Sequence, residues 1–124
     1  MSARVLVVDD EPLIADSVQA YLEDEGIEAD SVTSAEEALA RVGAACVYQV
    51  CIMDMRLPGM DGNAAIRALH GLCPRLRFII HTGSADYVVP ADLRAIGIAN
   101  AHLFRKPLVD MGSIAATVRA LVEG

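Results

Sequence analysis

The chain has few cysteines, and their arrangement suggests neither a bridge nor a metal site. Its 124 residues include three cysteines, at positions 46, 51 and 73, with no Cys-x-x-Cys pair. An odd number without close spacing indicates neither a disulfide framework nor a zinc site. We therefore expect Cys46, Cys51 and Cys73 to be buried, reduced thiols.

Long apolar runs and an excess of basic charge are also absent. No apolar run approaches the length needed to cross a bilayer, and the charges at Arg4, Asp9, Asp10 and Glu11 come too early for a signal peptide. Seventeen acidic residues against ten basic ones give a net charge of −7, which opposes binding to nucleic acid phosphates. These absences predict a cytoplasmic protein that uses no membrane and, by this domain alone, no nucleic acid.

The apolar content is nevertheless high enough for one well-filled core. Apolar residues make up 54% of the 124 positions, and no repeat, linker or low-complexity segment divides the chain. We expect residues 1–124 to form a single domain that folds alone, with no effector domain in this chain. It would then be either a complete protein or one domain of a longer one.

Short apolar runs alternate with amphipathic stretches along the whole chain. Five runs have the length and composition of strands: residues 4–8, 28–32, 48–53, 76–81 and 101–104. The predicted helices run from Pro12 to before Gly26, from the Ser34 cap to Gly43, through Ile66, Leu69 and Leu72 to before Pro74, from Pro90 to Ile96, and through Ile114, Val118, Leu121 and Val122. Five such units predict a flavodoxin-like, doubly wound α/β domain with five helices and a five-stranded parallel sheet in the order 2-1-3-4-5.

Acidic residues stand directly after two of the predicted strands. Residues 5–11 read VLVVDDE and residues 50–54 read VCIMD, so Asp9 and Asp10 end the first strand and Asp54 ends the third. Ligands of open α/β sheets bind beyond the carboxyl ends of the strands, where the strand order reverses. That point lies between the first and third strands, so the three carboxylates should face each other. Thr82 and Lys106 follow the neighbouring strands.

Such a cluster of carboxylates calls for a cation. Two like charges about 4 Å apart repel by roughly 4 kcal/mol at an effective dielectric constant of 20. Mg²⁺ takes one or two carboxylates and also accepts phosphate oxygens, so the site suits a phosphoryl group. Phosphoryl transfer needs mainly positioning and neutralised charge, which a metal and one lysine can provide. An aspartate can then act as the nucleophile and hold an acyl phosphate.

Four segments, VLVVDDEP, MDMRLPGMDG, IIHTGS and FRKP, together resemble the response regulator receiver domain of two-component signalling. The resemblance runs from Val5 into the last helix. It implies that Asp54 is the phosphoacceptor and that Asp9, Asp10, Asp54 and the backbone carbonyl of Arg56 hold Mg²⁺.

The same resemblance assigns roles to two residues at the ends of later strands. Thr82 would hydrogen-bond a phosphoryl oxygen, and Lys106 would pair with the phosphoryl charge, with a cis peptide bond between Lys106 and Pro107. The partner would be a sensor histidine kinase or a histidine phosphotransfer protein, and the output face would be the fourth helix, fifth strand and fifth helix. The protein would not be an enzyme with an external substrate, because its chemistry would be confined to phosphorylation and dephosphorylation of its own Asp54. It would be a monomer or a phosphorylation-dependent dimer.

Two other functions fit part of this pattern. A degenerate receiver acts only as an interaction module, but it would normally have lost Asp54, Lys106 or the acidic pair, and all are present. A phosphohydrolase of the haloacid dehalogenase type also uses an aspartyl nucleophile, but it needs a second aspartate two residues later, where this chain has Arg56.

Simpler structural roles are open to several of these residues. Asp9 and Asp10 could merely cap the first helix, and Lys106 could be a solvated surface lysine. Asp61 is expected to cap the third helix, and His81 is expected to be a packing residue rather than a metal ligand.

One position departs from the family pattern. Leu103 stands three residues before Lys106, where the family usually has tyrosine or phenylalanine as a switch. We therefore expect phosphorylation to move the loop from Gly83 to Val89 more than it moves residue 103.

Overall fold

A single parallel sheet carries the first and third strands side by side at its centre. The computed structural model describes residues 4–107 and 110–123. Its sheet has five strands in the order β2-β1-β3-β4-β5, with every neighbouring pair parallel. The strands are β1 (Arg4–Val8), β2 (Glu28–Val32), β3 (Val50–Met53), β4 (Arg77–Thr82) and β5 (Leu103–Arg105). The predicted fold class and strand order are confirmed.

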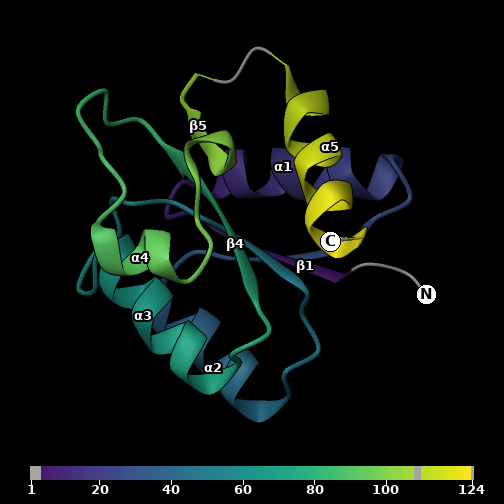
Figure 1. The fold of residues 1–124 in the computed structure, drawn as a ribbon. Helices are drawn as coiled ribbons and strands as arrows, with labels where there is room; N and C mark the ends of the chain where they lie inside the picture. Colours follow the sequence, from purple (N-terminus) through teal and green to yellow (C-terminus); the bar gives the residue numbers. More distant parts are fainter. Residues whose placement is uncertain (1–3, 108–109, 124) are drawn as a thin grey trace.

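Helices cover both faces of the sheet (Figure 1). They are α1 (Pro12–Asp24), α2 (Ala35–Ala44), α3 (Gly62–Leu72), α4 (Ala91–Ala95) and α5 (Met111–Glu123). α1 and α5 pack on one face, and α2, α3 and α4 pack on the other (Figure 1). Because both faces of the central strands are covered, the four residues of β3 and the four residues of β1 that follow the exposed Arg4 are all apolar and buried.

The core is accordingly divided into two apolar clusters by the sheet. Side chains alternate along each strand, so Leu6 and Val8 of β1 face α2 and α3, whereas Val5 and Val7 face α1 and α5. No helix in the part of the chain that the structure describes is long and apolar enough to cross a membrane.

Two helices begin at side-chain caps that the sequence indicates. The hydroxyl of Ser34 accepts a hydrogen bond from the backbone N–H of Glu37 at 3.1 Å, at the start of α2. The carboxylate of Asp61 accepts one from the N–H of Ala64 at 2.8 Å, at the start of α3, as predicted.

The last strand begins later than the sequence predicts. Residues 101–104 were expected to form it, but β5 is Leu103–Arg105, because Asn100–His102 form a turn of 3₁₀ helix. In that turn the N–H of His102 donates to the carbonyl of Ala99 at 2.9 Å. Backbone groups bonded locally in this way cannot join the sheet. The third strand likewise begins at Val50 rather than at the predicted residue 48.

The expectation of three reduced, buried thiols is wrong. Cys46 is exposed and is joined to Cys73 in a disulfide, with Cα atoms 5.8 Å apart. Only Cys51 is a free, buried thiol. The pairing escapes sequence reasoning because it depends on α2 and α3 ending at the same place in space. An odd number of cysteines excludes complete pairing but does not exclude one bridge.

Candidate functional site

Asp9 and Asp54 are brought together by the pairing of β1 with β3. Val8 lies opposite Met53 in the sheet, so the residues that follow them leave the sheet side by side. The N–H of Asp54 extends this pairing by donating to the carbonyl of Val8 at 2.9 Å. Asp9 and Asp54 are almost wholly buried, with 2% and 4% of their surfaces exposed. Burial fixes these two carboxylates at the carboxyl edge of the sheet.

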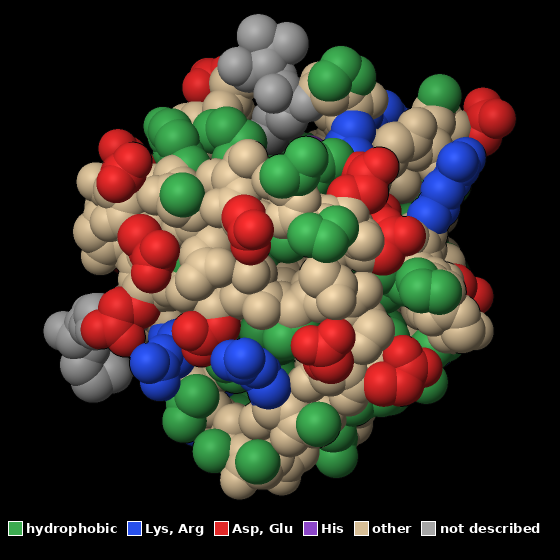
Figure 2. All heavy atoms as spheres, turned by 180° about the vertical axis from the view of Figure 1, so that it is seen from behind, with side chains coloured by type: hydrophobic (Ala, Val, Ile, Leu, Met, Phe, Trp, Pro, Cys, Tyr) green, Lys and Arg blue, Asp and Glu red, His purple; other side chains and the backbone are tan. Residues whose placement is uncertain are grey.

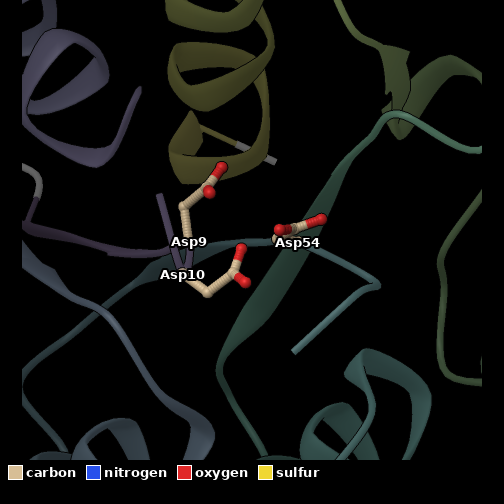
Figure 3. A group of neighbouring side chains, drawn as sticks. All are labelled: Asp9, Asp10 and Asp54. Atoms are coloured by element: carbon tan, nitrogen blue, oxygen red, sulfur yellow. The ribbon is translucent and has the colours of Figure 1, made fainter. Parts of the chain in front are cut away.

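Asp10 completes a group of three carboxylates. One carboxylate oxygen from each of Asp9, Asp10 and Asp54 lies within 4.8 Å of the others. Figure 3 shows the three side chains at the ends of neighbouring strands, and Asp10 is the exposed member of the group. Oxygen donors at this spacing suit a hard divalent cation such as Mg²⁺.

Lys106 lies against the same group. Its Nζ is 2.8 Å from Asp9 Oδ2 and 3.5 Å from Asp54 Oδ2, with Glu11 Oε2 further away at 3.8 Å. The N–H of Lys106 donates to the carbonyl of Thr82 at 2.8 Å, which holds the lysine beside the end of β4. The peptide bond between Lys106 and Pro107 is cis, as predicted. With 15% of its side chain exposed, Lys106 is not a solvated surface lysine.

Capping of α1 does not explain the positions of Asp9 and Asp10. Residue Glu11 occupies the N-cap position of α1, and no side chain donates or accepts a capping hydrogen bond there. Asp9 Oδ1 instead accepts a hydrogen bond from the N–H of Glu11 at 3.0 Å, which orients its other oxygen toward Lys106. The capping alternative for Asp9 and Asp10 is therefore wrong.

The charge of Asp54 is costly in this setting. Burial, together with the nearby charge of Asp9, raises the pKa of Asp54 to about 6, although the N–H of Arg56 and the ammonium of Lys106 act in the opposite direction. Burial opposes the charge of Lys106, but its hydrogen bond to Asp9 and the charge of Asp54 outweigh this and raise the pKa of Lys106. One lysine therefore only partly compensates three acids, and a cation among them would supply the remaining positive charge.

An open cavity of about 230 Å³ gives access to Asp54. It is lined by Asp10, Glu11, Asp54, Arg56, Gly83 and Lys106. The N–H of Arg56 donates to Asp54 Oδ1 at 3.3 Å, and its side chain is exposed. Thr82 is fully buried at the end of β4, and its hydroxyl accepts a hydrogen bond from the N–H of Ser84 at 3.1 Å. The structure thus gathers every predicted site residue at one edge of the sheet.

Comparison with known proteins identifies this arrangement. The sequence profile of the response regulator receiver domain matches residues 5–119. The chain belongs to the response regulator receiver family. This confirms the resemblance seen in the four sequence segments.

Individual receiver proteins show how close the similarity is. The chain is 38% identical over 93 residues to the transcriptional regulatory protein AruR of Pseudomonas aeruginosa, covering 71% of this chain and 37% of that protein. A CheY-like receiver domain from Methanospirillum hungatei JF-1 superimposes with a TM-score of 0.80 at 27% identity, covering 99% of this chain and 96% of the other. A response regulator protein from Burkholderia pseudomallei, solved with a phosphorylated aspartic acid, a calcium ion and citrate, has a TM-score of 0.78 at 25% identity, covering 96% and 72%.

The curated relatives are longer than this receiver. The chain spans 37%, 22% and 54% of the lengths of three of them, all transcriptional regulatory proteins. The similarity to these relatives therefore concerns the receiver domain and not the parts of those proteins that lie outside the match.

Gly62, whose role the sequence did not reveal, lets the start of α3 pack against the backbone of Asp54 and Met55. A Cβ atom on Gly62 would lie 2.6 Å from the carbonyl oxygen of Asp54 and 2.7 Å from the Cα of Met55. The N–H of Gly62 donates to the carbonyl of Met55 at 3.1 Å. Only glycine allows the first residue of α3 to approach the Asp54 backbone this closely. The sole sequence signal is the Asp61-Gly62 pair at the helix start.

The receiver's β4–α4 loop is held by contacts that the sequence did not reveal. The guanidinium of Arg105, on β5, donates to the carbonyl oxygens of Ser84 and Tyr87, the latter at 3.1 Å. The hydroxyl of Tyr87 donates to Asn63 Oδ1 on α3 at 2.6 Å. Leu103 packs against the cluster formed with α2, α3 and α4, at the edge of the sheet. Tyr87 and Leu103 line the same cavity, so the loop carries an aromatic side chain close to the position where the strand lacks one.

The contacts of His81 show no role for it in the acidic site. It is 4% exposed, as a packing residue would be, and its Nε2 has no hydrogen-bond partner among residues 4–107 and 110–123. Burial lowers the pKa of His81, and the charge of Lys106 lowers it further. A lowered pKa favours the neutral imidazole, which is compatible with the predicted packing role.

Proposed function

We propose that Asp54 accepts a phosphoryl group from a sensor histidine kinase or a histidine phosphotransfer protein. The observation that carries this proposal is the buried Asp54 carboxylate, which opens onto a cavity and lies beside Lys106, Asp9 and Asp10. A carboxylate oxygen of Asp54 attacks the phosphorus, the bond from phosphorus to the donor nitrogen breaks, and an acyl phosphate forms on Asp54. Water later hydrolyses that acyl phosphate. The phosphorylated aspartic acid in the Burkholderia relative supports this reading.

The surrounding residues would act by position and charge. Asp9, Asp10, Asp54 and the carbonyl of Arg56 would hold Mg²⁺, which when bound neutralises charge on the phosphoryl oxygens. Lys106, now paired with Asp9 and Asp54, would turn to the phosphoryl group as a further cation. The hydroxyl of Thr82 would donate to a phosphoryl oxygen, because its present bond uses it only as an acceptor. No other substrate is turned over.

Phosphorylation would be read out by a partner or by a linked domain. Several of the relatives that match this chain are transcriptional regulatory proteins, and one is a protein-glutamate methylesterase, so control of an effector is the class of output we infer. The interaction-module alternative gains no support from the site, since Asp10, Asp54 and Lys106 line one cavity and Asp9 lies beside them. The phosphohydrolase alternative would need an acid where the exposed Arg56 lies.

Phosphorylation with a small donor tests the proposal directly. Incubated with Mg²⁺ and acetyl phosphate, the protein should gain one phosphoryl group by intact mass, and peptide mapping should place it on Asp54. Asp54→Asn should gain none, because an amide is not a nucleophile here. Asp24→Asn, at the far end of α1, is the matched control and should label like the wild type. Full labelling of Asp54→Asn would overturn the assignment.

A further inference from the structure

The disulfide between Cys46 and Cys73 lies outside the phosphorylation site. Cys46 is in the loop that follows α2, and Cys73 is the residue that ends α3. Both lie at the amino ends of the strands, since one precedes β3 and the other precedes β4. The carboxylates of Asp9 and Asp54 lie at the opposite edge. The bridge is therefore independent of the charges and the cavity described above.

The approach of the two sulfurs follows from packing rather than from the bond itself. α2 and α3 share one apolar cluster, in which Val42, Leu69 and Cys73 are buried. The N–H of Cys73 donates to the carbonyl of Leu69 at 2.8 Å, so the end of α3 places this residue. Cα atoms 5.8 Å apart fall in the range that disulfides require. Reduction would therefore leave the two thiols close enough to pair again.

The three cysteines differ sharply in access to solvent. Cys46 is exposed, Cys73 has 2% of its surface exposed, and Cys51 is fully buried within β3. Burial also raises the pKa of Cys51 far above that of a free thiol, so its reactive thiolate form is suppressed. A small oxidant can reach Cys46 first, and Cys73 is the neighbour placed to resolve the adduct.

We propose that Cys46 and Cys73 form a reversible redox site, closed by a low-molecular-weight disulfide such as oxidised glutathione. The thiolate of Cys46 attacks one sulfur of the oxidant, and one glutathione thiolate leaves. The sulfur of Cys73 then attacks the Cys46 sulfur of this mixed disulfide, and the second glutathione leaves. The two protons of the cysteines pass to the two departing thiolates, and two electrons pass to the oxidant.

The bridge encloses the unit of the fold that carries Asp54. Its two cysteines are 27 positions apart and enclose β3, the loop after Asp54 and α3. Closing such a loop restricts the unfolded chain, and on the chain-entropy model it raises the melting temperature of a domain of this size by on the order of 10 °C. Because the bridge is remote from the acidic edge, the capacity of Asp54 to be phosphorylated should be the same in both redox states.

Thiol counting in glutathione buffers tests the redox site. The protein is equilibrated at a series of ratios of reduced to oxidised glutathione, quenched with acid, unfolded and alkylated. We expect three alkylated cysteines under reducing conditions and one, Cys51, under oxidising conditions, with a Cys46–Cys73 cross-linked peptide in the digest. Melting temperature should fall by on the order of 10 °C between the oxidised and reduced forms.

Single substitutions give matched controls. Cys51→Ala should keep the redox-dependent step in thiol count, whereas Cys46→Ser and Cys73→Ser should remove both that step and the redox dependence of melting. Three alkylated cysteines at every ratio would overturn the proposal. So would a bridge that involves Cys51, a bridge that forms only between two copies of the chain, or a bridge that excess dithiothreitol leaves intact in the folded protein. None of these outcomes bears on phosphorylation of Asp54.

Discussion

At the scale of single residues, Asp54 combines two properties that oppose each other. The nucleophile role that we propose for it needs a carboxylate, but burial and the charge of Asp9 favour the protonated acid and raise its pKa to about 6. The fold tolerates this because β1 and β3 are anchored by apolar side chains on both faces. The site thus gives up some stability to hold a reactive group at a fixed place.

Replacing Asp54 by asparagine should therefore stabilise the metal-free protein in a pH-dependent way. A folded-state pKa of about 6, above the usual 3.8, means that the proton binds the native state more tightly than the unfolded state. The stability due to this proton is present below about pH 4 and is lost as the pH rises through 6. At pH 7.5 we expect Asp54→Asn to exceed the wild type by roughly 1 to 3 kcal/mol in free energy of unfolding.

Urea denaturation in the presence of a chelator, at pH 4 and at pH 7.5, measures this difference. The two proteins should differ much less at the lower pH, since the wild-type acid is then protonated in the folded state and already partly protonated in the unfolded chain. A gain from Asp54→Asn that is equal at both pH values would show that the asparagine acts through packing and not through the removed charge.

At the scale of elements, the loop between β4 and α4 connects the proposed phosphorylation site to the surface. Its Ser84 donates its N–H to the hydroxyl of Thr82, and the carbonyls of Ser84 and Tyr87 accept from Arg105. Movement of Thr82 toward a phosphoryl group would displace Ser84 and would therefore also strain the hydrogen bonds between the loop and Arg105. Leu103 lacks a ring and a hydroxyl, which leaves the loop as the element best placed to report phosphorylation.

Phosphorylation should therefore change amide exchange in residues 83–89 more than at residue 103. A phosphoryl mimic should raise or lower exchange in this loop several-fold in the wild type. Arg105→Ala should raise loop exchange without any mimic, because the loop loses two hydrogen bonds, and the further effect of the mimic should shrink. Arg75→Ala changes an exposed arginine in the turn before β4; it is the control and should behave like the wild type. Unchanged exchange across 83–89 together with a rotamer change at Leu103 would contradict the prediction.

These elements show how far the sequence alone leads. Asp9, Asp54 and Lys106 could be placed together because parallel strands end at the same edge and the apolar runs locate those ends. The start of β5 could not be predicted from the sequence, because the turn at Asn100–His102 is held by local backbone hydrogen bonds, and these leave no apolar pattern in the sequence. Gly62 and the bridge at Cys46 depend on how α3 packs against β3 and α2. Sequence spacing does not encode such close approaches.

At the scale of the whole molecule, the protein carries an excess of negative charge, and three of its carboxylates are clustered in the site. The net charge is −7, and acidic side chains are spread across the face seen in Figure 2, where they outnumber lysine and arginine. Such a molecule attracts divalent cations at long range and repels polyanions. Within the site, Asp9, Asp10 and Asp54 add like charges within 4.8 Å, against the single ammonium of Lys106.

Mg²⁺ should therefore stabilise the folded protein as a whole. A ligand that binds only the native state adds about 2.7 kcal/mol at a hundred times its Kd, which is on the order of 10 °C in melting temperature for a domain of this size. Asp9→Asn and Asp10→Asn should each reduce this shift, because each removes a carboxylate from the group. Asp24→Asn removes the same charge from the far end of α1 and should leave the shift unchanged.

Thermal melts with and without Mg²⁺ measure this shift. Ionic strength is kept constant between the two, because added salt also screens the net charge. A wild-type melting temperature that Mg²⁺ does not change would contradict a metal site here, and an equal loss of the shift in Asp24→Asn would show that Mg²⁺ acts on the overall charge instead.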